Sequence, residues 1–204
     1  MKWVANLLVL ALAAPSGFAA TVAVTARDPQ GNALPDLVVW AMPKEGSAPA
    51  RARPGMVEQR NKAFVPLVSV VQTGTLVNFP NRDEVRHHVY SFSPAKRFEI
   101  KLYAGTPVDP IPFEKPGEVV LGCNIHDHMI AYVYVVDSPW FGKTDKDGLA
   151  RIEGLPAGEY EINAWFYAQD AKPASVAVKL RGDESGSAAF NVGRRPMPPR
   201  PAAR

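Results

Sequence analysis

Apolar and polar residues alternate in many short stretches of the chain, and residues typical of turns separate these stretches. An alternation with a period of two places every second side chain on the same face, which is the pattern of a β-strand. The stretch 130–136, for example, places Tyr132, Tyr134 and Val136 on one face. Further strands are predicted at 21–26, 37–41, 65–71, 75–79, 87–92, 118–121, 150–152, 160–166 and 175–180.

Segments rich in glycine, proline, asparagine and aspartate connect these stretches, for example at 28–32, 144–148 and 155–158. The chain contains 20 prolines and 15 glycines, which favours many short strands over long helices. No segment after residue 20 keeps a helical period. The sequence therefore predicts an all-β protein built as a β-sandwich or a barrel.

The first residues have the pattern of a secretory signal peptide. Lys2 is followed by an apolar run over 3–14, and the small residues Gly17 and Ala19 precede an expected cleavage site after Ala19. The alternative is an uncleaved membrane anchor, but the run is shorter than the roughly 20 residues that a membrane span needs. No later stretch could cross a membrane. We therefore expect residues 1–19 to be removed and the mature chain to lie in the periplasm.

Charge and motifs exclude several classes of function. The 23 basic and 20 acidic residues leave a net charge of +3, and no basic cluster is interleaved with aromatic residues, so a nucleic-acid partner is not expected. The chain also shows no Ser–His–Asp set, no paired carboxylates and no glycine-rich phosphate loop. An enzyme is therefore not expected.

The residues that could bind a metal are concentrated in two short segments. The four histidines of the chain are His87, His88, His126 and His128. Cys123 is the only cysteine, and with His126 and Met129 it forms a Cys-x2-His-x2-Met spacing. A lone thiol in an oxidising compartment is protected by burial or by a metal. Each residue alone fits an ordinary structural role, but their convergence on two segments predicts a metal site.

A thiolate, two imidazoles and a weak axial thioether suit copper in both of its oxidation states. Cys123, His126 and Met129 fit one tight loop between the strands predicted at 118–121 and 130–136, and His87 or His88 would supply the remaining ligand. The thiolate is the binding form of the cysteine, so metal binding must displace its proton. Zinc is the alternative metal, although a thioether is a poor ligand for zinc. We expect one copper ion per chain.

These two segments resemble those of the cupredoxins. The loop is similar to the amicyanin-type ligand loop, and the upstream stretch resembles an Asn-x-Asp turn followed by a histidine, a small polar residue and Val. In this chain that upstream pattern consists of Asn81, Asp83, His87, His88 and Val89. The resemblance implies a Greek-key β-sandwich. The copper ligands that it implies are His87, Cys123 and His126 in the equatorial plane and Met129 on the axis.

The loop departs from the amicyanin-type pattern in one respect. Such loops carry proline, whereas this loop has Asn124, Ile125, Asp127 and His128. His128 lies beside Met129 and is an alternative ligand, and an extra imidazole would lower the redox potential. His88 falls where the family has Asn or Thr that braces the cysteine loop. His88 and Asn81 are therefore candidates for supporting residues or alternative ligands.

Wider matches indicate a partner and a second module. Residues 87–96 and 122–127 are similar to periplasmic plastocyanin-like proteins of the methylamine utilization type, which implies an electron-transfer role with a dehydrogenase or a cytochrome c. Residues 22–39 and 144–160 resemble a prealbumin-like, carboxypeptidase-regulatory-type module, which would bind protein or carbohydrate. The predicted domains are a signal peptide at 1–19, the flanking β-module at 20–54 and 137–193, the copper domain at 55–136 and a disordered tail at 194–204.

The function expected from the sequence is that of a periplasmic type 1 copper protein that carries single electrons, with an amine-oxidising system as its setting. Two alternatives stay open. One is a copper chaperone or store in which the metal does not change its oxidation state. The other is a protein-binding or carbohydrate-binding module with a structural copper site.

Overall fold

The computed structural model describes residues 19–107, 109–169, 173–182 and 184–195. The predicted signal peptide, apart from Ala19, and residues 196–204 of the predicted tail lie outside this part. The secondary-structure elements of the described residues are all β-strands, so the prediction of an all-β protein is confirmed. In the described residues, no helix is long and apolar enough to cross a bilayer.

The described residues form strands that group into five sheets. The strands are β1 (Ala20–Arg27), β2 (Val38–Pro43), β3 (Gly55–Met56), β4 (Glu58–Arg60), β5 (Ala63–Val65), β6 (Val68–Gln72), β7 (Thr75–Asn78), β8 (His87–Ser93), β9 (Lys96–Tyr103), β10 (Ile111–Phe113), β11 (Gly117–Gly122), β12 (Ile130–Val136), β13 (Phe141–Lys143), β14 (Leu149–Leu155), β15 (Gly158–Trp165), β16 (Ala174–Leu180) and β17 (Gly186–Asn191).

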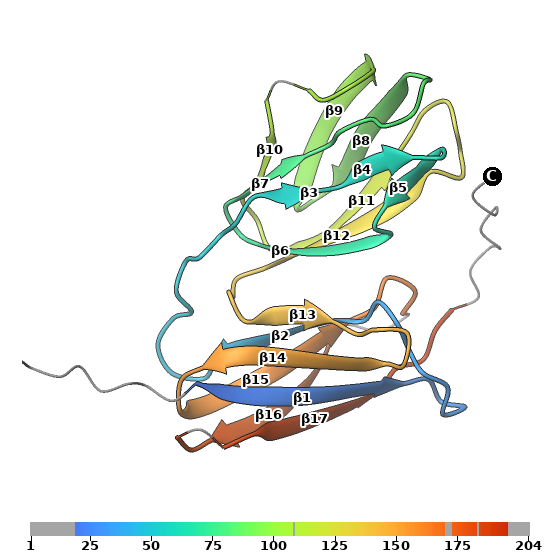
Figure 1. The fold of residues 1–204 in the computed structure, drawn as a ribbon. Helices are drawn as coiled ribbons and strands as arrows, with labels where there is room; N and C mark the ends of the chain where they lie inside the picture. Colours follow the sequence, from blue (N-terminus) through green and yellow to red (C-terminus); the bar gives the residue numbers. More distant parts are fainter. Residues whose placement is uncertain (1–18, 108, 170–172, 183, 196–204) are drawn as a thin grey trace, which may run out of the picture.

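Strands β3 to β12 form the upper sandwich, drawn in blue-green to yellow in Figure 1. Its five-stranded sheet has the order β6-β12-β11-β8-β9, and the smaller sheet β10-β7-β3 and the hairpin β4-β5 lie opposite. Inward-facing residues such as Val89, Leu121 and Val133 pack on Phe79 and Phe113 to form one buried cluster. Gly122, the last residue of β11, pairs with Tyr90 in the middle of β8, and the two strands are antiparallel, so the segment that follows β11 lies beside the first residues of β8.

Strands β1, β2 and β13 to β17 form the lower sandwich. Its sheets have the orders β13-β2-β15-β16 and β14-β1-β17. Val22 on β1, Val39 on β2, Ile152 on β14 and Ile162 on β15 are buried in its core. These residues come from both ends of the chain, so the chain enters the upper sandwich after β2 and returns to the lower one with β13.

Strand β12 joins the two sandwiches because both of its faces are buried. Val133 and Val135 face the upper core. Tyr132 and Tyr134 face the lower sandwich, where the ring of Tyr134 stacks on that of Trp165 at a centroid distance of 4.5 Å. A buried aromatic pair of this kind contributes about 0.5–1.5 kcal/mol beyond its area burial. The two sandwiches are therefore held together by a hydrophobic interface that includes β12.

Two local predictions can be compared with the structure. The single strand predicted at 65–71 is wrong at its start, because β5 ends at Val65 and β6 begins at Val68. Pro66 lies between them and has no N–H group with which to continue a ladder. Arg194 and Arg195 begin the predicted disordered tail, and Arg195 N–H donates a hydrogen bond to the carbonyl of Ala168 at 2.8 Å.

Candidate metal centre

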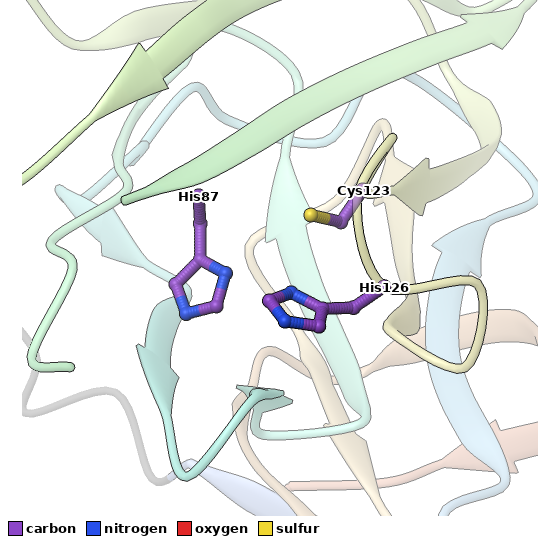
Figure 2. Close-up of side chains that lie close together, drawn as sticks. All are labelled: His87, Cys123 and His126. Carbon is purple, nitrogen blue, oxygen red and sulfur yellow. The ribbon is translucent and has the colours of Figure 1, made fainter. Parts of the chain in front are cut away.

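Three side chains that could bind a metal meet at one end of the upper sandwich. His87 is the first residue of β8, Cys123 follows the last residue of β11, and His126 lies in the loop that leads to β12. One ligand atom from each of the three lies within 4.8 Å of the other two. Figure 2 shows the cysteine sulfur and the two imidazole rings around a common space. His87 and Cys123 are buried, and His126 is partly exposed.

The two histidines each present a nitrogen that has no partner. Nδ1 of His87 and Nδ1 of His126 are buried and make no hydrogen bond. A buried polar atom without a partner costs about 1–3 kcal/mol, and native structures rarely contain one without a reason. The donor set of two imidazole nitrogens and one sulfur fits a metal ion, which would give both nitrogens a partner.

The other nitrogen of His87 is held by a carboxylate. Nε2 of His87 lies 2.7 Å from Oδ2 of Asp83. Burial alone would raise the pKa of Asp83, but hydrogen bonds from the backbone of Lys62, from His87 and from the backbone of Asn61 lower it below its ordinary value of 3.8. The ionised carboxylate can only accept hydrogen bonds, so Nε2 of His87 is the donor. In the neutral ring, the lone pair then lies on Nδ1.

His126 is also kept in its neutral form. Burial, followed by the charges of His87 and His128, lowers the pKa of His126 below its ordinary value of 6.5. A neutral imidazole is the form that binds a metal. Its unpartnered Nδ1 is therefore available near neutral pH.

Met129 lies at the end of the same loop. Its side chain is 1% exposed and belongs to the buried cluster that contains Cys123. Its N–H group donates a hydrogen bond of 2.9 Å to the carbonyl of His126, which closes the loop on itself. The structure therefore places the side chain of Met129 in the core, beside the loop that carries Cys123 and His126.

His88 does not belong to this group. Its ring lies edge-on to that of Tyr90 at a centroid distance of 5.9 Å, whereas Val89, between these two residues, packs in the buried cluster. Its Nδ1 accepts a hydrogen bond of 3.1 Å from the side-chain amide of Asn124, the residue after Cys123. Its Nε2 lies 3.0 Å from a carboxylate oxygen of Glu99, although the two atoms are not aligned for a hydrogen bond. His88 therefore supports the cysteine loop from the other side of the sheet.

His128 also lies outside the converging group, although its ring centroid is 5.9 Å from that of His126. The ring is exposed, and Nε2 donates a hydrogen bond of 3.1 Å to the backbone carbonyl of Lys62. This contact turns one ring nitrogen of His128 toward the β4-β5 hairpin.

Asn81 shapes the segment that leads to His87. Its amide group donates hydrogen bonds to the carbonyls of Val85 at 2.8 Å and Tyr103 at 2.9 Å. Its side-chain oxygen accepts a hydrogen bond of 2.9 Å from the N–H of Asp83. All three hydrogen bonds join the side chain of Asn81 to backbone groups, so Asn81 is a supporting residue of the loop.

No family model matches the chain, and the search of curated proteins gave no match. Solved structures give partial matches. They include a copper-containing nitrite reductase from Thermus scotoductus SA-01, with 27% identity, a TM-score of 0.39, and coverage of 47% of this chain and 25% of that chain. A purple cupredoxin from Nitrosopumilus maritimus matches with 22% identity and a TM-score of 0.35, over 41% of this chain and 98% of that one.

A reduced, Cu(I) form of a single-substitution mutant of amicyanin also matches, with 16% identity and a TM-score of 0.38, over 47% of this chain and 98% of that chain. This chain thus spans about a quarter of the nitrite reductase and nearly all of the two cupredoxins. All three TM-scores lie below 0.5. Where these names mention copper, they describe the matched proteins and not this chain.

The part played by Asp83 and the β4-β5 hairpin was not foreseen from the sequence. Asp83 was a member of the upstream pattern, but its bond to His87 and its two bonds to the hairpin are visible only in the structure. The signal in the sequence was the spacing of Asp83 and His87, four residues apart. That spacing alone does not show which way either side chain points.

Proposed function

We propose that the chain binds one copper ion through His87, Cys123 and His126, with Met129 as a weak axial ligand. The observation that carries this proposal is the convergence of two buried, unpartnered imidazole nitrogens with the only thiol of the chain. Each of these groups lacks a structural explanation by itself, and one metal ion would satisfy all of them.

Copper fits this donor set better than zinc does. A sulfur with two imidazole nitrogens and a weak axial thioether is the ligand set of blue-copper electron-transfer sites. Structural zinc sites use four cysteine or histidine ligands instead. A bound copper ion would supply a couple between Cu(I) and Cu(II) that exchanges one electron.

The chain contributes a pre-arranged set of ligands to that chemistry. His87 is fixed at the start of β8, and Cys123 is fixed at the end of β11, which pairs with β8 and β12. Buried positions at strand ends limit how far these ligands could move between the two oxidation states. Limited movement is what a carrier of single electrons needs, so we propose electron transfer rather than storage.

We further propose that the protein works in the periplasm and exchanges electrons with a dehydrogenase or a cytochrome c, in an amine-oxidising system. The copper domain would comprise residues 55–136, and the flanking module would comprise 20–54 and 137–193. Two separate hydrophobic cores, one within each of these parts, support the division. Within the aromatic run 165–167, Trp165 and Phe166 are buried, which speaks against this run as a carbohydrate-binding face.

The test is to add Cu(II) to the purified protein and record its visible spectrum. We expect an intense thiolate-to-copper band that a reductant bleaches and an oxidant restores. Cys123→Ser should abolish the band, Met129→Leu should keep it and shift the potential, and His128→Ala should keep the band. A protein that stays colourless and retains only Cu(I) would contradict electron transfer and indicate storage, and a band that survives Cys123→Ser would refute the ligand assignment.

A further inference from the structure

The tip of the β4-β5 hairpin has an unusual backbone for its sequence. Asn61 and Lys62 both have a φ angle of 53°, in the left-handed region. Two such residues in succession form the tight turn that suits a two-residue hairpin, where Asn-Gly is the preferred sequence. Asparagine tolerates this conformation, whereas for lysine it costs roughly 1–2 kcal/mol. Strained residues of this kind cluster at functional sites, so the contacts of the turn need an explanation.

The turn directs two N–H groups at one carboxylate. The N–H of Asn61 donates to Oδ1 of Asp83 at 2.6 Å, and the N–H of Lys62 donates to Oδ2 of the same residue at 2.8 Å. The side chain of Asp83 is only 13% exposed, so water competes little for these bonds. Because both oxygens are held, the carboxylate has one fixed orientation.

The fixed carboxylate meets a candidate copper ligand. Oδ2 of Asp83, which also accepts the Lys62 hydrogen bond, lies 2.7 Å from Nε2 of His87, whose side chain is fully buried. The carbonyl of Lys62 accepts the hydrogen bond from Nε2 of His128 at 3.1 Å. One turn therefore contacts the segment that carries His87 and the loop that carries Cys123 and His126.

We propose that Asp83, held by the turn of Asn61 and Lys62, is a positioning residue that presets His87 as an Nδ1 ligand before a metal arrives. Its carboxylate keeps the proton of His87 on Nε2, fixes the orientation of the ring and makes Nδ1 a stronger donor. Its negative charge also favours the more positive, oxidised form of the centre. The ligand role of His87 rests on the proposed function, but the position of its proton is a property of the metal-free chain.

The first test uses the metal-free protein. Nitrogen-15 NMR of the imidazoles should show His87 with its proton on Nε2, and Asp83→Ala should remove that preference. Glu84→Gln is the matched control, because it removes the neighbouring negative charge at an exposed residue. It should leave the proton of His87 in place. An unchanged spectrum of His87 in Asp83→Ala would overturn the proposal.

The second test measures the same variants with copper. Loss of a residue that supports a metal ligand typically weakens metal binding about 10–100-fold, and we expect a loss of this size for Asp83→Ala. Asp83→Asn retains the shape and removes the charge, so it should raise the reduction potential and keep the visible band. An equal rise in Glu84→Gln would show that the charge acts without the contact, and would overturn the positioning role.

The two proposals can fail separately. If the chain binds no copper but His87 carries its proton on Nε2 only when Asp83 is present, the copper function is wrong and the positioning role stands. If the chain becomes coloured with copper and the position of the His87 proton does not depend on Asp83, the copper function stands and the positioning role is wrong. Circular dichroism shows whether Asp83→Ala folds, and if it does not, Asp83→Asn carries both tests.

Discussion

The two sandwiches differ in whether their buried polar side-chain atoms have hydrogen-bond partners. In the lower sandwich, the hydroxyl of Thr144 accepts the N–H of Leu37 at 2.9 Å and donates to the carbonyl of Leu34 at 2.6 Å. In the upper sandwich, four buried side-chain atoms make no hydrogen bond: Gln59 Oε1, His87 Nδ1, His88 Nε2 and His126 Nδ1. In the described residues, no such atom lies in the lower sandwich.

The unpartnered polar atoms of the upper sandwich need an explanation. Native proteins satisfy nearly all buried polar atoms, and exceptions occur where function requires them. The unpartnered nitrogens of His87 and His126 converge with a thiol, so they indicate a site that a ligand completes. The candidate metal site therefore lies in the upper sandwich, whereas Thr144 shows how the lower sandwich pairs a buried polar group within itself.

The largest effect is expected in the lower core. Ile162 is fully buried there, and Ile162→Ala should lower the free energy of unfolding by about 2–5 kcal/mol. The visible band with copper should persist under folding conditions, because the candidate ligands lie in the other sandwich. Urea denaturation and the visible spectrum measure the two effects. Leu149→Ala, at a residue that is 45% exposed on β14, is the control and should cost much less.

Copper should stabilise the chain through the upper sandwich. A ligand that binds only the folded state adds about 2.7 kcal/mol when its free concentration is 100 times Kd. Thermal unfolding with and without Cu(II) measures this gain, which Cys123→Ser should remove. An equal gain in the Cys123→Ser variant would place the copper elsewhere on the chain.

Removing a buried polar group should have different costs in the two sandwiches. Thr144→Val deletes both hydrogen bonds of the hydroxyl and should cost about 1–3 kcal/mol, because Leu37 N–H and Leu34 carbonyl stay buried. His126→Leu removes a buried nitrogen that has no partner, so it should raise the stability of the metal-free protein, by about 1–3 kcal/mol. Urea denaturation of both metal-free variants measures the two changes in the free energy of unfolding. Equal losses of stability in the two variants would contradict the comparison.

The smallest effect is expected at the β4-β5 turn. Lys62→Gly relieves the left-handed backbone but makes the unfolded chain more flexible, so the net gain in stability should be about 0.5–1 kcal/mol. Lys101→Gly, in the regular strand β9, is the control and should lower the stability. A loss of stability in Lys62→Gly would show that the lysine side chain contributes more than its backbone costs.

The fold was predictable where the alternation of residues was strong. The predicted strand 130–136 matches β12, whose two apolar faces contact different cores. Strands β4 and β5 have three residues each, which is too few to show a period. No strand was predicted at β9, although charged and apolar residues alternate there from Arg97 to Leu102, so the sequence does contain the pattern of this strand.

The candidate site was partly predictable because its residue types are rare in this chain. Cys123 and the histidines stand out by composition, and the structure brings His87, Cys123 and His126 together. That they bind a metal stays a prediction. The contact of Asp83 with the turn at Asn61 could not be foreseen, because it joins residues 22 positions apart and depends on how two loops pack.

One sulfur and two imidazole nitrogens of the upper sandwich should bind the same copper ion. X-ray absorption at the copper edge, on protein loaded with one equivalent of Cu(II), measures the bound atoms directly. We expect one short bond to sulfur and two bonds to imidazole nitrogen, with the sulfur bond lost in Cys123→Ser. A coordination shell of nitrogen and oxygen alone in the unsubstituted protein would contradict it.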